Sequence, residues 1–148
     1  MARLLGKTLI AIFAVVLSAG SALANDVLMP FVFAGNQSGD VASVAADVKS
    51  KLKGAGFEIV GEYSPYAGAN IIIVTSEAQK AHAAKSEFGA YGAISRVAIT
   101  QNGDNVEVSY TNPVYMAAAY RMATDMADIR AKLEDALGAE MDYGSEKN

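Results

Sequence analysis

Apolar residues recur along the chain with two different periods, which predict strands alternating with helices. Some segments are short and rich in branched or aromatic residues, or alternate between apolar and polar positions, as strands do. The predicted strands are 27–33, 57–63, 70–75, 93–100 and 106–110. Within the third of these, Ile71–Val74 is a run of branched residues, which is typical of a strand buried on both faces.

Two helices are predicted between these strands. Asp40 is a residue type that caps helices, and Gly54 is typical of a helix end. The apolar positions between them share one face of a helix: Val41, Val44, Ala45, Val48 and Leu52. Ser76, with Gln79 three residues later, resembles a capping box and begins a shorter helix that runs to about residue 87.

A further helix is predicted near the end of the chain. Asn112 and Pro113 form a typical helix start, with Asn at the cap and Pro at the first helical position. The apolar pattern continues to Leu137, either as one long helix or as two short ones. Residues 141–148 are polar and are expected to fray.

The resulting order of elements is β-α-β-β-α-β-β-α. The clearest local link is the turn signal Asn102-Gly103, which predicts a hairpin between the last two strands. Runs of strands separated by helices in one small domain favour the α+β class. We expect a single sheet of about five strands, with helices mainly on one face.

The first 24 residues have the three-part layout of a secretory signal peptide. A short segment with Arg3 and Lys7 precedes the apolar run Thr8–Leu17, and Ala22-Leu23-Ala24 follows. The apolar run is shorter than the roughly 20 residues that span a bilayer, which disfavours a retained membrane anchor. We therefore expect cleavage after Ala24, export to the periplasm, and a single mature domain of residues 25–148.

Charge and cysteine content narrow the function of this mature domain. Loss of Arg3 and Lys7 changes the balance from 12 basic and 16 acidic side chains to 10 and 16, a formal charge of −6. An acidic domain without a basic run is a poor binder of nucleic acid or anionic membranes, so neither is expected as a partner. The chain has no cysteine, which excludes disulfides, thiol chemistry, iron–sulfur clusters and covalent c-type haem.

Several short motifs occur in a fixed succession. Residues 52–57 read Leu-x-x-x-Gly-Phe, Arg96-Val97 lies in a strand, a hairpin follows, and Asn112-Pro113 begins a helix. Over about residues 40–120 this succession resembles the family called domain of unknown function 302. The resemblance implies a compact α/β domain, often dimeric, and it implies no activity.

Arg96 is a candidate ligand-binding residue. It lies inside the predicted strand 93–100, and alternation places it on the opposite face from Val97 and Ile99. A guanidinium in such a strand needs a partner or solvent. Arg96 either holds a ligand carboxylate or phosphate in bidentate fashion, or forms a structural salt bridge with Glu87 or Glu107.

Tyrosines near the predicted strand ends are further candidates. Tyr66 and Tyr91 lie in loops, and Tyr115 follows Asn112 at the start of the last helix. A tyrosine-lined cleft beside Arg96 would bind a small, partly apolar anion. The alternative is that these tyrosines fill the edge of the core and keep their hydroxyls in water.

His82 is the only histidine, and it lies on the predicted short helix. It is a candidate ligand-binding residue, general base or metal ligand, or alternatively a helix-packing residue. Together with Met116, Met122 and Met126 it suggests a periplasmic copper or haem accessory protein. However, the apolar stripe that continues through Met126 to Leu133 favours a core helix or a helix–helix seam.

No catalytic constellation, metal site or cofactor motif is recognisable in the chain. We therefore expect a non-enzymatic exported domain that binds a small ligand or a partner protein. The candidate ligand-binding residues are Arg96, Tyr91, Tyr66, Asn112, Tyr115 and His82. The alternatives are a homo-oligomeric assembly module, with the C-terminal stripe as a homodimer seam, and the copper or haem accessory protein.

Overall fold

The computed structural model describes residues 27–144. Its elements are, in chain order, β1 (Phe31–Gln37), α1 (Val41–Gly54), β2 (Glu58–Tyr63), β3 (Ala69–Thr75), α2 (Glu77–Ala83), the 3-10 helix η1 (Gly89–Gly92), β4 (Ser95–Asn102), β5 (Asn105–Thr111), α3 (Pro113–Ala119), α4 (Ala127–Leu137) and β6 (Met141–Tyr143). The expected signal segment, residues 1–24, lies outside the described residues, as does the end of the chain from 145.

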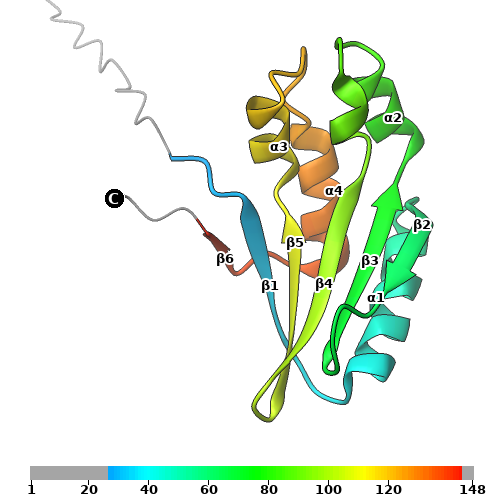
Figure 1. Ribbon diagram of the computed structural model, residues 1–148, viewed down its shortest axis with the longest axis vertical. Helices are drawn as coiled ribbons and strands as arrows, with labels where there is room; N and C mark the ends of the chain where they lie inside the picture. The colour runs from blue at the N-terminus through cyan, green and yellow to red at the C-terminus, as the bar shows by residue number, and fades with distance from the viewer. Residues whose placement is uncertain (1–26, 145–148) are drawn as a thin grey trace, which may run out of the picture.

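The strands form one antiparallel sheet in the order β2-β3-β4-β5-β1-β6 (Figure 1). The predicted α+β class is confirmed, with six strands in place of about five. The additional strand is β6, in which Met141–Tyr143 pairs with Phe31–Phe33 at the edge of β1. The expectation that this part of the tail frays is wrong, because three residues are too few for their alternation to be recognised in the sequence.

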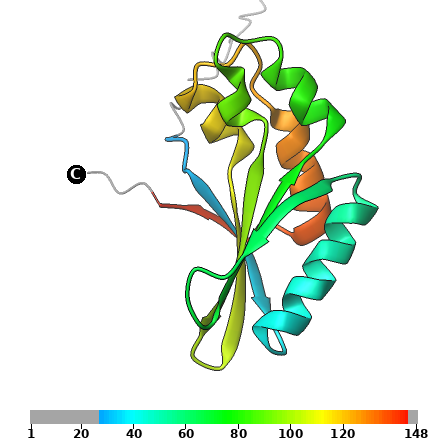
Figure 2. The ribbon, with the colours of Figure 1, turned by 45° about the vertical axis from the view of Figure 1, so that its right-hand side comes forward.

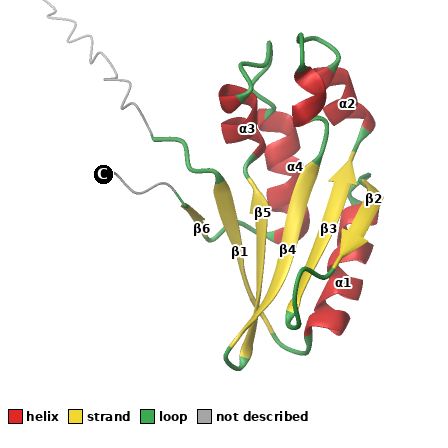
Figure 3. Ribbon diagram, in the orientation of Figure 1, coloured by secondary structure: helices red, strands yellow, loops and turns green. Residues whose placement is uncertain are grey.

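Helices α1 and α4 lie against the same face of the sheet, as the predicted one-sided arrangement requires (Figures 2 and 3). Their apolar sides meet the inward-facing side chains of the strands in one core. Its strand members include Val32, Ile72, Val97, Ile99 and Val108. No helix within residues 27–144 is long and apolar enough to cross a bilayer.

Helix α1 forms as its sequence pattern predicts. The Asp40 carboxylate accepts a hydrogen bond from the Ser43 backbone N–H at 2.7 Å, and the Ser43 hydroxyl accepts one from the Asp40 N–H at 3.2 Å. These two bonds satisfy backbone donors that the first turn leaves free. The predicted stripe is buried at Val44, Ala45, Val48 and Leu52. This stripe fixes which side of α1 faces the sheet.

The last predicted helix is divided into α3 and α4 by a turn at 120–126. Arg121 and Met126 have left-handed backbones, with φ of 52° and 56°, which an α-helix cannot accommodate. Met126, Ile129 and Leu133 are buried in the core, at 1%, 0% and 0% exposure. The stripe from Met126 to Leu133 therefore packs inside the monomer, which favours its interpretation as a core helix over that as a homodimer seam.

Candidate functional site

Among residues 27–144, no helix lies on the sheet face opposite α1 and α4, and we call this face the open face (Figure 2). Strand pairing places two rows of side chains side by side on it. One row crosses the sheet through Ile73, Arg96, Thr111, Phe31 and Tyr143, and the next through Tyr63, Ile71, Ala98, Ser109 and Phe33. These side chains lie on the open face because their strand neighbours point into the core.

A groove with a volume of about 280 Å3 runs along this face. The central strands β4 and β5 contribute small side chains to it, namely Ala98, Ser109 and Thr111. The outer strands contribute large ones, with Tyr63 on one side and Phe31 on the other. Small residues between large residues leave a hollow, so the groove follows directly from the sequence of the strands and their register.

One wall of the groove is a pair of aromatic rings. Phe31 of β1 and Tyr143 of β6 are directly paired across the two strands, and their ring centroids lie 5.6 Å apart. Tyr63 of β2 stands across the sheet from them and is 49% exposed. Aromatic side chains with this much free surface can bury a ring or alkyl chain of a ligand.

Arg96 supplies the positive charge of the groove. Its side chain is exposed, and no residue within 27–144 forms an ion pair or hydrogen bond with its guanidinium. The structural salt bridge considered for Arg96 is therefore not formed with Glu87 or with Glu107, whose carboxylate instead accepts a hydrogen bond from Asn102 at 2.7 Å. The guanidinium of Arg96 keeps its donors available to a bound anion.

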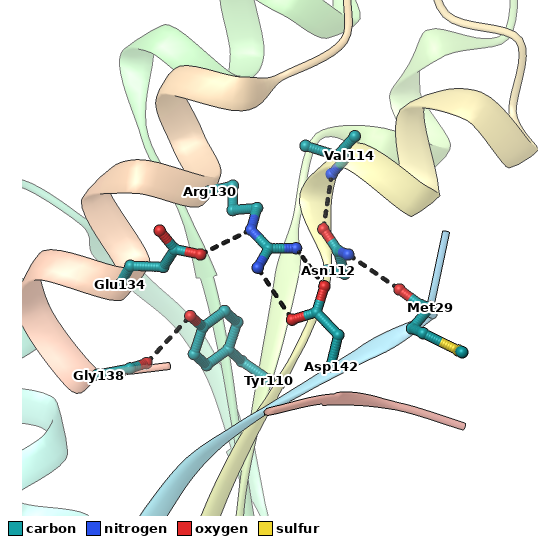
Figure 4. Close-up of polar contacts among 8 residues, drawn as sticks. All are labelled: Met29, Tyr110, Asn112, Val114, Arg130, Glu134, Gly138 and Asp142. Atoms are coloured by element: carbon teal, nitrogen blue, oxygen red, sulfur yellow. Dashed lines mark hydrogen bonds and ion pairs between the residues drawn. The ribbon is translucent and has the colours of Figure 1, made fainter. Parts of the chain in front are cut away.

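A second layer of polar contacts fixes the aromatic wall from behind (Figure 4). Arg130 of α4 donates two hydrogen bonds to the Asp142 carboxylate, at 2.7 and 2.9 Å, and a third to Glu134 at 2.7 Å. The hydrogen bonds to Asp142 raise the pKa of Arg130, so the guanidinium stays charged. Because Asp142 precedes Tyr143 on β6, this ion pair holds β6 against β1 and positions the Tyr143 ring on the open face.

Asn112 and Tyr110 belong to the same supporting layer (Figure 4). Asn112 is fully buried, accepts a hydrogen bond from the Val114 N–H at 3.1 Å, and donates one to the Met29 carbonyl at 2.9 Å. The Tyr110 hydroxyl donates to the Gly138 carbonyl at 3.1 Å, and burial raises its pKa. Asn112 thus caps α3 and anchors the segment before β1 instead of lining the groove.

The tyrosines singled out in the sequence lie elsewhere. Tyr91 stacks on Tyr120 with ring centroids 5.6 Å apart, Tyr66 is in the exposed β2–β3 loop, and Tyr115 is on α3. Of the predicted set, only Arg96 lines the groove. The groove residues missed were Phe31, Tyr63 and Tyr143, whose signal was their alternation with buried neighbours such as Val32.

His82 is the centre of a separate polar cluster. Its Nδ1 lies 2.7 Å from the Thr124 hydroxyl oxygen, and its Nε2 lies 2.9 Å from a carboxylate oxygen of Asp128. Partial burial opposes ionisation of Asp128, but the hydrogen bond from His82 and backbone N–H groups lower its pKa below the usual value. The cluster joins α2, the 120–126 turn and the start of α4.

The methionines considered with His82 are placed mainly by packing. Met126 is in the core, and Met122 packs against it. Within residues 27–144, no group of three or more His, Cys, Asp or Glu residues is arranged to hold a metal ion.

The architecture defines the class of the protein, an α+β domain with one antiparallel sheet covered by helices on a single face. Among solved structures, it is similar to an uncharacterised conserved protein of the DUF302 type (domain of unknown function 302) from Bacillus stearothermophilus, with a TM-score of 0.65. That match covers 74% of this chain and 96% of the other, at 14% sequence identity. The chain therefore has a DUF302-like fold, as its motifs predicted.

Comparison of the sequence with family models and with curated proteins adds nothing to this assignment. No model of a protein family matches the sequence, and no curated protein is similar to it. An identity of 14% establishes a shared fold and nothing about shared function.

Proposed function

We propose that this protein binds a small, partly apolar anion in the groove of the open face. The observation that carries the proposal is the Arg96 guanidinium, which is exposed and unpaired within residues 27–144 and lines a groove walled by aromatic rings. A charge of one sign set in apolar walls is the usual arrangement of sites that orient a small organic ion.

The shape and chemistry of the groove indicate a carboxylate with a ring or short alkyl chain. Its volume of about 280 Å3 suits a small organic molecule. A planar guanidinium matches a carboxylate in bidentate fashion, and Phe31, Tyr63 and Tyr143 offer apolar contact. The Thr111 oxygen accepts a hydrogen bond from the Arg96 backbone N–H at 3.1 Å, so its own hydroxyl hydrogen is free to be donated to the ligand.

Binding is favoured over catalysis in this groove by the residues that line it. Ser109 and Thr111 provide hydroxyl groups, but no histidine or carboxylate is among the lining residues to take up their protons. A hydroxyl without a neighbouring base is a weak nucleophile. The proposed role is therefore that of a receptor or carrier for the ligand.

Thermal unfolding with benzoate, hexanoate and inorganic phosphate tests this role. At a ligand concentration of about 100 Kd, stabilisation of about 2.7 kcal/mol is expected, which raises Tm by several degrees. Arg96→Ala removes charge-assisted hydrogen bonds and is expected to weaken carboxylate binding about 10- to 150-fold.

Lys132→Ala removes another exposed cation, which lies on α4 outside the groove, and is the matched control that keeps the full shift. Arg96→Lys tests the need for a planar donor and should bind with intermediate affinity. Equal stabilisation of the wild type and of Arg96→Ala by these anions, or stabilisation of neither protein, would contradict the proposal.

We propose that the protein is exported to the periplasm and loses its first 24 residues in the process. The support is the three-part pattern of the leading segment. Intact mass and N-terminal sequencing of the protein from a periplasmic extract should show a chain that begins at Asn25. Replacing both Ala22 and Ala24 by Asp should block this cleavage and leave a longer chain, whereas a wild-type chain retained in the cytoplasm with its leading segment would refute export.

A further inference from the structure

We propose that Thr124, His82 and Asp128 form a hydrolytic site for small esters, separate from the groove of the open face. The three side chains are linked through the imidazole of His82, whose Nδ1 contacts the Thr124 hydroxyl and whose Nε2 contacts the Asp128 carboxylate. A hydroxyl, an imidazole and a carboxylate in this sequence of contacts have the roles of nucleophile, general base and orienting group in acyl transfer.

The geometry places the proton-accepting atom against the nucleophile. A neutral imidazole carries one N–H, and the ionised Asp128 carboxylate, 2.9 Å from Nε2, favours the tautomer in which Nε2 holds it. Nδ1 then presents its lone pair to the Thr124 hydroxyl at 2.7 Å, within the reach required of a general base. The lowered pKa of Asp128 keeps its carboxylate ionised, which stabilises the imidazolium formed during the reaction.

Left-handed backbone is concentrated around Thr124. Arg121 and Met126, which flank it, have left-handed φ values of 52° and 56°. Phe88 is the third non-glycine residue within 27–144 with such a backbone, and its segment contacts this turn through a hydrogen bond from the Ala123 N–H to the Ser86 hydroxyl. Backbones of this kind concentrate at functional sites.

The inferred donors for a developing oxyanion are backbone N–H groups of the turn that carries the nucleophile. The backbone N–H groups of Thr124, Asp125 and Met126 have no acceptor among the described residues, whereas the next N–H, of Ala127, donates to the Asp125 carboxylate at 3.1 Å. Successive free N–H groups that end in a left-handed residue form a concavity suited to negative charge. Such donors stabilise the tetrahedral intermediate of acyl transfer.

A hollow for the substrate adjoins Thr124. It has a volume of about 320 Å3, and its lining includes the apolar Leu28, Val114 and Ala117 together with Arg121, Thr124 and Asp125. Its size and mostly apolar lining fit a short acyl group, with the Arg121 side chain available to an electronegative substituent. The inferred substrate class is therefore a small ester with a short acyl chain.

In the inferred reaction, the Thr124 hydroxyl oxygen forms a bond to the ester carbonyl carbon as Nδ1 of His82 takes its proton. Collapse of the tetrahedral intermediate breaks the bond to the alcohol oxygen, and the imidazolium returns its proton to the departing alcohol. A water molecule then attacks the acyl-threonine by the same route, releasing the carboxylic acid and restoring the Thr124 hydroxyl.

Hydrolysis of p-nitrophenyl acetate by the purified protein tests the site. The wild type is expected to exceed the buffer rate, Thr124→Val to fall to that rate, and Thr124→Ser to retain activity. His82→Gln should lose about 100-fold or more, as is usual when a general base is removed. Thr100→Val removes a strand hydroxyl of β4 that lies outside this cluster and outside the lining of both hollows, and it serves as the control that remains active.

Covalent labelling provides a readout that does not depend on the variants folding. An alkyl fluorophosphonate should react with the wild type once, and peptide mass spectrometry should place the adduct on Thr124. Activity that survives Thr124→Val would overturn the proposal. Because the chain has one histidine and no cysteine, loss of that residual activity in Thr124→Val/His82→Gln would then indicate direct attack by the imidazole. If the wild type neither hydrolyses the ester nor reacts with the label, the three residues serve only to hold α2 against α4. That result would also overturn the proposal.

Discussion

Replacing Leu133 by alanine is expected to lower the free energy of unfolding by about 2–5 kcal/mol. Leu133 is fully buried at 0% exposure, on the side of α4 that packs with α1 and the sheet. Truncation removes apolar contacts and leaves a cavity that neighbouring strands can fill only by moving. Chemical denaturation should show this loss, and Tm should fall by about 10 °C or more in a domain of this size.

Two matched variants separate the loss of packing from a general effect on α4. Lys132→Ala changes the adjacent, exposed position and is expected to alter stability by no more than about 0.5 kcal/mol. Leu133→Met keeps most of the volume and should cost less than about 1.5 kcal/mol. If Leu133→Ala were as mild as Lys132→Ala, Leu133 could not lie in the core of the monomer.

The main elements could be predicted from the sequence because their signals are local. The apolar stripe of α1 and its capping residue Asp40 lie within one continuous segment, and both have the predicted roles in the structure. The run Ile71–Val74 was correctly placed as a strand, but only Ile72 and Val74 are fully buried. Ile71 and Ile73 alternate with them and face the open side of the sheet, on which the described part of the chain places no helix.

The groove could be predicted only in part, because it depends on the register between strands that are distant in the chain. Arg96 could be assigned to a face by alternation alone. Arg96 lies near Phe31 and Tyr143 because β1 pairs with both β5 and β6. No local pattern in the sequence specifies these strand pairings. The prediction therefore chose tyrosines close in sequence, such as Tyr91, which the structure places against Tyr120 instead.

The cluster around His82 depends even more on tertiary structure. His82 and Thr124 are separated by 42 residues, and they meet because the turn at 120–126 interrupts what otherwise resembles one continuous helix. The sequence permitted either one helix or two. A single continuous helix would exclude the left-handed backbone of Met126 and the turn that carries Thr124.

Replacing Asn112 by alanine is expected to destabilise the protein by about 2–4 kcal/mol, the second large effect. Loss of the side-chain acceptor for the Val114 N–H removes the N-cap of α3, which typically costs about 1 kcal/mol. Loss of the side-chain donor leaves the Met29 carbonyl without its partner in a partly buried position, at a further cost of about 1–3 kcal/mol. Denaturant titration and thermal unfolding measure the sum.

Two further measurements decide whether Asn112 supports the groove or takes part in binding. Asn112→Ser retains a capping oxygen and loses the contact with Met29, so it should recover about 1 kcal/mol relative to alanine. Asn112 does not line the groove, so the carboxylate that stabilises the wild type should stabilise Asn112→Ala by a similar increment from a lower starting Tm. A variant with wild-type stability but no response to the ligand would reverse this assignment and make Asn112 a binding residue, as the sequence first suggested.

The same pair of measurements on Arg96→Ala should give the opposite result, with stability retained and ligand response lost, because its guanidinium has no partner among the described residues.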